Sequence, residues 1–356
     1  MKKIYSMETY IVKADMPVLS AMELMSAKPH GEQFLVIVDD AGTLKGTLTD
    51  GDIRRALISG KDISGPVDDF MHHAPVFAMI SDEVSKVRGQ LKSEQSSIIF
   101  LPVLNPDFTI NHIIVQKQTS INSTYALIMA GGFGKRLGKL TSNLPKPLLK
   151  VGDIPLIEHV LRQIENVGVK HIYISVHYLA ELIEAYVKET GREGSVSVIK
   201  EEEPLGTAGA ISMLPDFNQG NLIVTNCDLI TELDYNDLID FHCSFKTDAT
   251  VAVATHKVQI PFGVIRYDKS GRFEKIEEKP TISNYVAAGI YIFSCDFIKS
   301  HRIIGKLDMP DYISLGRSKG MQTSIFPLHE EWADIGRPED LENAITQLST
   351  EESSNG

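Results

Sequence analysis

A glycine-rich segment followed by two basic residues is the strongest chemical feature of the sequence. Gly131-Gly-Phe-Gly-Lys-Arg follows the apolar run 126–130, which we predict to be a buried strand. Three glycines in four residues let the backbone turn tightly and present N–H groups to anionic oxygens. Lys135 and Arg136 add positive charge, and a guanidinium can hold a phosphate through two hydrogen bonds. The pattern predicts a phosphate-binding loop at the carboxyl end of a strand.

Two common glycine-rich fingerprints do not fit this loop. Leu137 occupies the third glycine position of the dinucleotide fingerprint, and Arg136 stands where the Walker pattern needs Ser or Thr. A structural turn would explain the glycines but not the basic pair. Ten residues beyond Arg136, the prolines of Pro145-Lys-Pro restrict the backbone around Lys146. We expect Lys146 to reach the same phosphates from the other side.

Two acids stand where a divalent cation could bind between them. Asp228 ends the apolar run 222–227, and Asp334 lies in a predicted loop before the last helix. Magnesium prefers oxygen ligands, usually one or two carboxylates together with phosphates and water. For either acid alone, a helix cap or a turn is the more common role. The residues by themselves therefore leave both readings open.

The glycine loop and the Pro-Lys-Pro segment together resemble a family signature. Gly131-Gly-x-Gly-x-Arg-Leu followed by Pro145-Lys-Pro-Leu is similar to the signature of sugar-1-phosphate nucleotidyltransferases, also called nucleotide-sugar pyrophosphorylases. The resemblance extends from about Tyr125 to Leu348. It implies that a sugar phosphate oxygen attacks the α-phosphorus of a nucleoside triphosphate and expels pyrophosphate. Because both reactants are anions, catalysis must come mainly from positioning and charge neutralisation.

The resemblance also assigns roles to individual residues. It implies that Arg136, Lys146 and Asp228 are catalytic, and that Asp228 and Asp334 bind Mg²⁺. The nucleotide-binding residues that it implies are Ala130, Gly131, Gly132, Gly134, Lys135, Glu203, Gly206 and Thr207. Glu203 would accept hydrogen bonds from guanine, which makes GTP the favoured substrate.

The sugar phosphate is assigned to a later part of the sequence. The resemblance implies contacts from Gly263, Glu278, Lys279 and Ala287. Glu278 would hold sugar hydroxyls and Lys279 the phosphate, although the residues alone are equally typical of a charged hairpin edge. Many relatives carry a polar residue, often Asn, where this chain has Ala287. Ala287 has no side-chain hydrogen bond to offer a sugar hydroxyl.

The first 118 residues predict a separate α+β module. They contain two βαβ-like units, about 1–62 and 63–118, which suggest an internal repeat. Gly46-Thr-Leu-Thr-Asp-Gly-Asp resembles the ligand-binding segment of CBS domains, which implies that Thr49 and Asp52 hold a nucleotide at a helix N-terminus. The second unit lacks an equivalent pair, so at most one regulatory nucleotide is expected. CBS pairs commonly dimerise, and we predict a homodimer through this module; a purely structural role is equally compatible.

Strands and helices alternate from Tyr125 onwards. Apolar runs predict strands at 171–176, 221–225 and 250–254, and the spacing of apolar residues predicts a helix over 156–167. This order predicts an α/β fold, a Rossmann-like, mainly parallel sheet, preceded by the tandem CBS module. We place a polar linker at 119–124, the nucleotidyltransferase domain at 125–348 and a disordered tail at 349–356. A further helix is expected between 83 and 92.

Composition excludes several classes of protein. The chain of 356 residues carries a formal net charge of −12, whereas nucleic-acid binders usually have a basic surplus. No apolar run approaches the roughly 20 residues of a membrane span. Three cysteines without a CxxC pair favour a reducing compartment. We therefore expect a cytoplasmic enzyme with no nucleic-acid or membrane partner.

A CBS pair ahead of such a domain narrows the choice of nucleotide and sugar substrates. This arrangement is similar to guanylyltransferases that make GDP-glucosamine for bacterial legionaminic acid synthesis. The leading hypothesis is transfer of GMP from GTP to glucosamine 1-phosphate, forming a nucleotide sugar for nonulosonate or surface glycan synthesis. Mannose-1-phosphate guanylyl transfer and uridylyl or cytidylyl transfer are alternatives. A catalytically silent regulator that senses nucleotide sugars is the alternative of another class.

Overall fold

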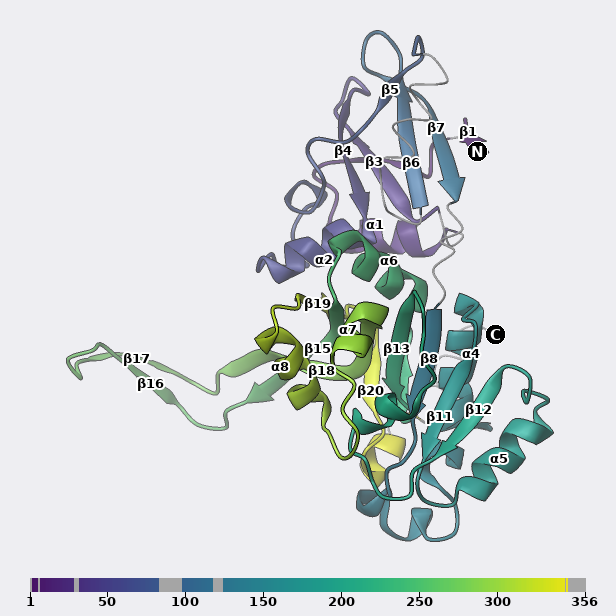
Figure 1. Ribbon diagram of the computed structural model, residues 1–356. Helices are drawn as coiled ribbons and strands as arrows, with labels where there is room; N and C mark the ends of the chain where they lie inside the picture. The colour runs from purple at the N-terminus through teal and green to yellow at the C-terminus, as the bar shows by residue number, and fades with distance from the viewer. Residues whose placement is uncertain are drawn as a thin grey trace. The chain divides into compact units, whose positions relative to one another are not determined.

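The computed structural model describes residues 2–5, 7–28, 32–82, 98–117, 124–342 and 344. The chain divides into two compact units (Figure 1). The first, which we call the N-terminal unit, comprises Met1–Asn122 and Asn236–Thr247. The second comprises Ser123–Tyr235 and Asp248–Gly356, and we call it the catalytic unit because the sequence predicts the active site there. The helix predicted between 83 and 92, the tail at 349–356 and all of the linker except Thr124 lie outside the described residues.

The N-terminal unit contains two small sheets. One has the strand order β1-β7-β6-β5 and the other the order β2-β3-β4. Its strands and helices are β1 (Lys2–Ile4), β2 (Ile11–Lys13), α1 (Val18–Ser26), β3 (Phe34–Val38), β4 (Leu44–Thr49), α2 (Asp50–Ile58), η1 (Val67–Asp69), β5 (Ala78–Met79), β6 (Ile98–Leu104) and β7 (Ile110–Lys117). All five residues of β3 are buried, because its two faces pack against different hydrophobic clusters. The unbroken apolar run predicted such a strand.

The catalytic unit is built on a sheet of seven strands in the order β12-β11-β8-β13-β18-β15-β19. The first four are mutually parallel, and β18 runs antiparallel to both of its neighbours. The elements around the predicted phosphate loop are β8 (Thr124–Met129), η2 (Lys135–Thr141), η3 (Lys146–Leu148), β9 (Lys150–Val151), β10 (Ile154–Pro155), α4 (Leu156–Val167), β11 (Ile172–Val176), α5 (Ala180–Glu189), β12 (Val196–Lys200) and η4 (Gly209–Met213). The mainly parallel α/β fold predicted from the sequence is confirmed.

The second half of this unit completes the sheet and adds a hairpin. Its elements are β13 (Asn221–Asn226), β14 (Leu229–Thr231), β15 (Ala249–Gln259), β16 (Val264–Tyr267), β17 (Phe273–Glu277), β18 (Thr281–Ser294), α7 (Cys295–Ser300), α8 (Met309–Ser318), β19 (Thr323–Pro327) and β20 (Trp332–Asp334). Helix α6 (Tyr235–Phe245), which follows β14 in sequence, groups by its contacts with the N-terminal unit. Residues 338–342 are helical, as Pro338 and the acids after it predicted.

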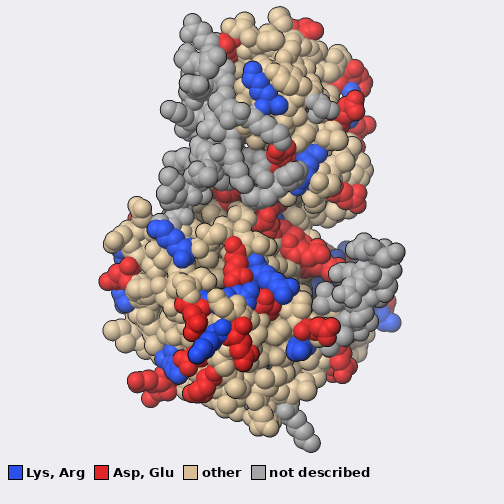
Figure 2. Space-filling model, turned by 90° about the vertical axis from the view of Figure 1, so that its right-hand side faces the viewer, with Lys and Arg blue, Asp and Glu red and all other residues tan. Residues whose placement is uncertain are grey.

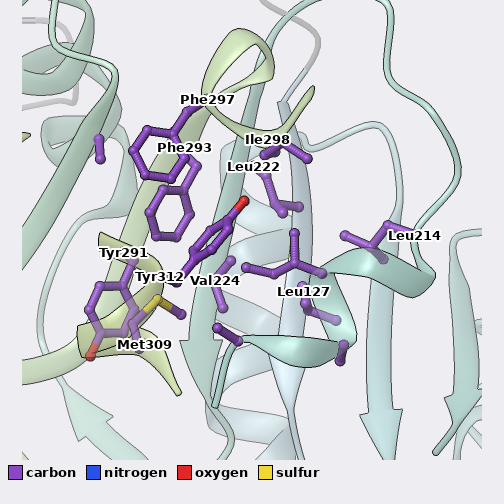
Figure 3. Close-up of a cluster of buried hydrophobic side chains, with 14 of the residues drawn as sticks. Leu127, Leu214, Leu222, Val224, Tyr291, Phe293, Phe297, Ile298, Met309 and Tyr312 are labelled. Atoms are coloured by element: carbon purple, nitrogen blue, oxygen red, sulfur yellow. The ribbon is translucent and has the colours of Figure 1, made fainter. Parts of the chain in front are cut away.

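Aromatic side chains hold the middle of the sheet to helices α7 and α8 (Figure 3). Leu127 of β8 and Leu222 of β13 are fully buried beside Phe293 of β18. The ring of Tyr312 meets those of Phe293 and Phe297 edge-on, with 5.2 Å between ring centroids in each pair. Edge-to-face pairs of this kind add to the stabilisation from burial. The core thus fixes the strands whose carboxyl ends carry the predicted site.

Strands β15 and β18 continue well beyond the sheet (Figure 1). The sequence predicted a strand at 250–254, but the structure extends it to Gln259, where it pairs with Thr281. The hairpin β16–β17 then forms the end of this projection. The strand predicted at 250–254 was too short because its continuation is an exposed ladder with polar residues. Such residues lack the apolar pattern that predicts a buried strand. We call residues 255–285 the arm.

Charges of both signs are interspersed on the molecular face drawn in Figure 2, without a continuous basic surface. A basic surface would be expected for a protein whose affinity depends on nucleic-acid phosphates. Among the helices that the structure describes, none has the length and apolarity needed to span a membrane.

Candidate active site

A cavity of about 500 Å³ opens at the carboxyl ends of β8 and β13. Parallel strands bring their carboxyl ends to one edge of a sheet, where ligands bind in open α/β folds. The predicted residues that line the cavity are Ala130, Gly131, Gly132, Gly134, Arg136, Lys146, Gly206, Thr207 and Asp228. Segments that are far apart in sequence therefore meet at the one place where the glycine loop predicted a phosphate.

The glycine loop is held tightly on one side and open on the other. A Cβ on Gly131 would lie 2.8 Å from Oε1 of Glu201, and one on Gly134 would lie 2.8 Å from a methyl carbon of Thr141. A Cβ on Gly132 would meet nothing within 4 Å. The Thr141 hydroxyl donates to the carbonyl of Gly134, which fixes the return of the loop. The loop is thus shaped to bring its backbone close to a ligand. The side chain of Lys135, predicted to bind nucleotide, lies outside the described residues.

Lys146 and Asp228 form a partly desolvated ion pair at the base of the cavity. Pro145 precedes the short helix η3, and Pro147 lies within it, so the backbone of Lys146 is fixed as predicted. The lysine side chain is 10% exposed and that of Asp228 16%. A charge held in this way can act on a phosphate with little reorganisation.

Asp334 lies next to Asp228 because their two short strands pair. In the antiparallel ladder β14–β20, Leu229 opposes Asp334, and the N–H of Ile335 donates to the carbonyl of Asp228 at 3.0 Å. The prediction of a loop at Asp334 was wrong, since it is the last residue of β20. Desolvation and the neighbouring Asp228 raise the pKa of the Asp334 carboxyl, and Lys146 and Arg136 oppose this. The two carboxylates therefore repel each other across one small space.

The predicted base-binding segment is anchored to the loop before α8. Gly206 has φ +76°, and a Cβ there would lie 2.5 Å from Oδ1 of Asp308. The Thr207 hydroxyl accepts from the N–H of Met309 at 2.8 Å. Leu307 N–H donates to the carbonyl of Leu205, closing the contact. The glycine at 206 thus serves close packing as well as the cavity wall.

Glu201 lines the cavity, although the sequence pointed to Glu203. Glu203 is exposed and is not among the lining residues that the structure describes. Glu201 is buried, receives the Ser175 hydroxyl, and accepts from the N–H of Leu205 at 2.9 Å. It sits directly under Gly131. Its place follows from β12 pairing in parallel with β11, and the sequence analysis had no signal for it.

Asn226 and Cys227 also line the cavity and were not predicted. The Asn226 amide lies 2.6 Å from where a Cβ of Gly289 would stand, so this glycine leaves room for it. Burial raises the pKa of the Cys227 thiol, which keeps that group protonated. Asn226 is the last residue of β13, and Cys227 lies between it and Asp228; proximity to that acid was their only sequence signal.

The residues predicted to hold the sugar phosphate lie elsewhere. Gly263, Glu278, Lys279 and Ala287 are exposed, and none lines the cavity. Gly263 and Glu278 are neighbours on the arm, since a Cβ on Gly263 would lie 3.0 Å from Oε2 of Glu278. The structure therefore brings the predicted nucleotide and metal residues together, and leaves the predicted acceptor residues on the arm.

In the N-terminal unit, Thr49 and Asp52 begin helix α2. The Thr49 hydroxyl accepts from the Asp52 N–H at 3.2 Å, and the Asp52 carboxylate accepts from the Thr49 N–H at 2.9 Å. This is a reciprocal capping box. Both residues line a cavity of about 290 Å³ within the N-terminal unit. Arg55 also lines it and forms an ion pair with Asp52.

Comparison with known proteins agrees with this geometry. Residues 125–351 match the nucleotidyl transferase family, and residues 2–59 match the CBS domain. The chain belongs to the nucleotidyl transferase family. This confirms the family inferred from the glycine loop and the Pro-Lys-Pro segment. One CBS domain is likewise confirmed, whereas the second unit at 63–118 and the domain bounds stay predictions.

Several nucleotidyl transferases are similar to this chain. Mannose-1-phosphate guanylyltransferase catalytic subunit beta of Danio rerio is 33% identical over 61% of this chain and 62% of its own length. Mannose-1-phosphate guanylyltransferase 1 of Arabidopsis thaliana is 31% identical over 60% of this chain and 62% of its own. The crystal structure of HddC from Yersinia pseudotuberculosis is 26% identical with a TM-score of 0.50, covering 63% of this chain and 99% of HddC. The chain thus spans about three fifths of the length of these curated relatives.

Nucleotidyl transferases of this family generally use divalent metal ions. The donor set at Asp228 and Asp334 fits such an ion, because both ligands are hard carboxylate oxygens beside a cavity. Their mutual repulsion, seen in the raised pKa of Asp334, would be relieved by a cation between them.

Proposed function

We propose that this chain transfers GMP from GTP to a sugar 1-phosphate and releases pyrophosphate, with glucosamine 1-phosphate as the first candidate acceptor. One observation carries the proposal. Arg136, Lys146 and Asp228, which come from three separate segments, line one cavity with the glycine loop. That arrangement supplies backbone donors, two cations and a carboxylate around the place where a triphosphate would lie. It is suited to charge neutralisation in phosphoryl chemistry.

Each of these residues has a distinct task in the proposed reaction. A Cβ on Gly132 would meet nothing within 4 Å, so the backbone there is open to a ligand, and its N–H groups would hold phosphate oxygens. Lys146, held by its ion pair and flanking prolines, would neutralise charge developing at the α-phosphate, and Arg136 would hold the departing pyrophosphate. Asp228 and Asp334 would hold Mg²⁺, which when bound supplies further charge neutralisation and alignment of the phosphates.

The choice of base and sugar rests on the names of the curated relatives and on the CBS domain. The guanylyltransferase names of the curated relatives favour GTP over UTP and CTP. The same names favour mannose 1-phosphate as a second candidate acceptor. Glucosamine 1-phosphate comes first because a CBS domain precedes the catalytic domain, as in enzymes that this chain resembles. Such an enzyme would work in the cytoplasm, where its nucleotide substrate is made.

The alternative of another class is a regulator that senses nucleotide sugars without turnover. The chain keeps two cations and two carboxylates in one place, namely Arg136, Lys146, Asp228 and Asp334. This argues against a regulator, because a sensor needs no metal-binding carboxylate pair. A regulatory nucleotide at Thr49 and Asp52 is compatible with either function.

A substrate matrix tests the proposal. Four nucleoside triphosphates are combined with glucosamine, mannose and glucose 1-phosphates in the presence of Mg²⁺, and pyrophosphate release is measured. We expect turnover with GTP, highest with glucosamine 1-phosphate, and loss of activity in Asp228→Asn or with EDTA. Undiminished release in Asp228→Asn would overturn the metal assignment. Absence of turnover with every pair, alongside measurable binding of a nucleotide sugar, would favour the regulator.

A further inference from the structure

The arm has one apolar face and one charged face. In the hairpin β16–β17, Ile265 stands opposite Ile276, and Tyr267 opposite Phe273. Ile265 and Tyr267 are two residues apart on β16 and share a face. A register shift between Arg266 and Tyr267 keeps Ile276 and Phe273 opposite them, so these four side chains form one surface. They are 56% to 68% exposed. An isolated two-stranded ribbon is marginally stable in water, so this face needs a partner.

The opposite face of the same hairpin is polar and paired. Arg266 and Lys275 both form ion pairs with Glu277, at 2.7 and 2.6 Å. Those pairs hold the pKa of Glu277 at about 2, well below its usual range. The hairpin is therefore two-sided: its polar side chains pair with one another, whereas its large apolar side chains are exposed.

The arm begins beside the cavity but extends away from it. Gly289, near the root of the arm in β18, approaches Asn226 of the cavity wall. The ladder between β15 and β18 then runs without interruption from Val253↔Ala287 to Gln259↔Thr281. At ~3.3 Å per residue, this ladder places Thr281 about 20 Å beyond Ala287. Lys279 lies beyond Thr281 on this arm, in the segment between β17 and β18. Folding back onto its own cavity would require breaking this ladder.

The described lining of the cavity holds few positive charges for two phosphorylated substrates. Among its lining residues that the structure describes, Arg136 and Lys146 are the cations, and Lys146 is already paired with Asp228. The arm, by contrast, has six Lys or Arg and four Asp or Glu, within a chain of net charge −12. A basic, apolar-faced arm is thus complementary to an acidic protein with an under-charged site.

We propose that the arm of one copy of this chain closes over the cavity of a second copy and supplies Lys279 and Glu278 to the sugar 1-phosphate. The inference rests on the proposed function for the identity of the ligand. It gives the apolar face an occupant, explains why the acceptor residues are absent from their own cavity, and makes each active site a product of two chains.

Mixed dimers distinguish this arrangement from closure within one chain. Asp228→Asn on one chain and Lys279→Ala on the other are co-expressed with different tags, and mixed dimers are isolated by sequential capture. If each arm closes over the cavity of the other chain, one site stays intact. It consists of the cavity of the Lys279→Ala chain and the arm of the Asp228→Asn chain. We expect about half of the wild-type turnover per dimer, while each variant alone is inactive.

The matched control carries both substitutions on one chain, paired with an unchanged chain. Exchange between copies then leaves no intact site, and activity is lost, whereas closure within one chain leaves half. Inactive mixed dimers in the first experiment with half activity in the control would overturn the proposal. So would full activity of Lys279→Ala alone, or failure to capture any mixed dimer.

A crosslinking experiment tests the contact without relying on turnover. Lys279→Cys on one tagged chain and Phe133→Cys, at the cavity rim, on the other are treated with a flexible bismaleimide. We expect a covalent product at twice the chain mass, strengthened by GTP. The protein without engineered cysteines is the control, because native Cys227 and Cys295 are buried but Cys243 is partly exposed. With both substitutions on one chain, a product of single-chain mass would contradict exchange, as would no product. If the substrate matrix shows no turnover but this crosslink forms, the proposed function fails and the exchange stands.

Discussion

Four charged side chains at the cavity behave as one electrostatic group. Burial and the charge of Asp228 raise the pKa of Asp334, while Lys146 and Arg136 lower it. The lysine also forms the ion pair that keeps Asp228 in place. Neutralising any member changes the charge balance of the other three, so their contributions to catalysis should not be additive.

Lys146→Met tests this group at its least exposed cation. Methionine keeps much of the volume but removes the charge that would neutralise the α-phosphate, so we expect kcat/KM to fall by roughly 10²–10³-fold. Lys150→Met, at an exposed lysine four residues away, is the matched control and should keep its activity. The readout is initial pyrophosphate release over a range of substrate concentrations. A loss no larger than that of the control would remove Lys146 from the catalytic residues.

At the scale of elements, local signals located the phosphate loop but not all of its surroundings. The sequence alone identifies the glycines at 131, 132 and 134 and the Pro-Lys-Pro segment. Glycine frees the backbone and proline restricts it wherever these residue types occur. Glu201 enters the cavity only through the pairing of β12 with β11, which no local pattern states. A charged hairpin edge was only the alternative interpretation of the residues around Glu278, and the direction of the arm depends on how far β15 and β18 stay paired.

Helix α2 offers a prediction about capping. Thr49→Ala removes the side-chain half of the capping box, which costs about 1 kcal/mol of local helix stability. We expect amide exchange over 50–58 to quicken about fivefold by hydrogen-exchange mass spectrometry. Thr9→Ala, at an exposed threonine of the same unit, is the control and should leave this peptide unchanged. Unchanged exchange in both variants would show that tertiary packing, not the cap, sets the stability of α2.

Helices α4 and α5 meet at a carboxylate whose titration predicts acid sensitivity. Burial would raise the pKa of Glu158, but hydrogen bonds from Arg192, Tyr186 and Arg162 lower it to about 2. A lowered folded-state pKa stabilises the fold above the unfolded value near 4.5 and loses that stabilisation as pH falls towards 2. We expect a loss on the order of 2 kcal/mol between pH 6 and pH 3.

Urea unfolding followed by tryptophan fluorescence measures this loss, because Trp332, the one tryptophan, lies in the catalytic unit. Glu158→Gln should be less stable at pH 6 and show a shallower decline towards pH 3. Glu184→Gln, at an exposed ion pair with Lys200, is the control and should follow the wild-type curve. Parallel curves for all three proteins would assign the acid sensitivity to other groups.

For the whole molecule, two separate features favour association between copies. The predicted CBS-mediated homodimer would form through the N-terminal unit, whereas the arm belongs to the catalytic unit. These associations have different consequences. Loss of a purely structural dimer contact would leave the cavity intact, but loss of the arm contact would remove Lys279 from the acceptor site.

Ile265→Asp with Phe273→Asp separates these two associations. The acids place charge on the apolar face of the arm, so docking should weaken while the ladder of β15 and β18 persists. We expect KM for the sugar 1-phosphate to rise at least tenfold, which corresponds to about 1.4 kcal/mol of binding, with little change in KM for GTP. Arg266→Ala with Lys275→Ala, on the polar face, is the matched control.

The mass in solution then identifies which contact holds the copies together. A variant that remains a dimer but binds sugar phosphate poorly would show that the N-terminal unit maintains the pair while the arm completes the site. A monomer with the same defect would make the arm the main contact. Equal increases in both KM values would instead point to damage of the cavity itself, because the glycine loop lines the cavity and no described residue of the arm does.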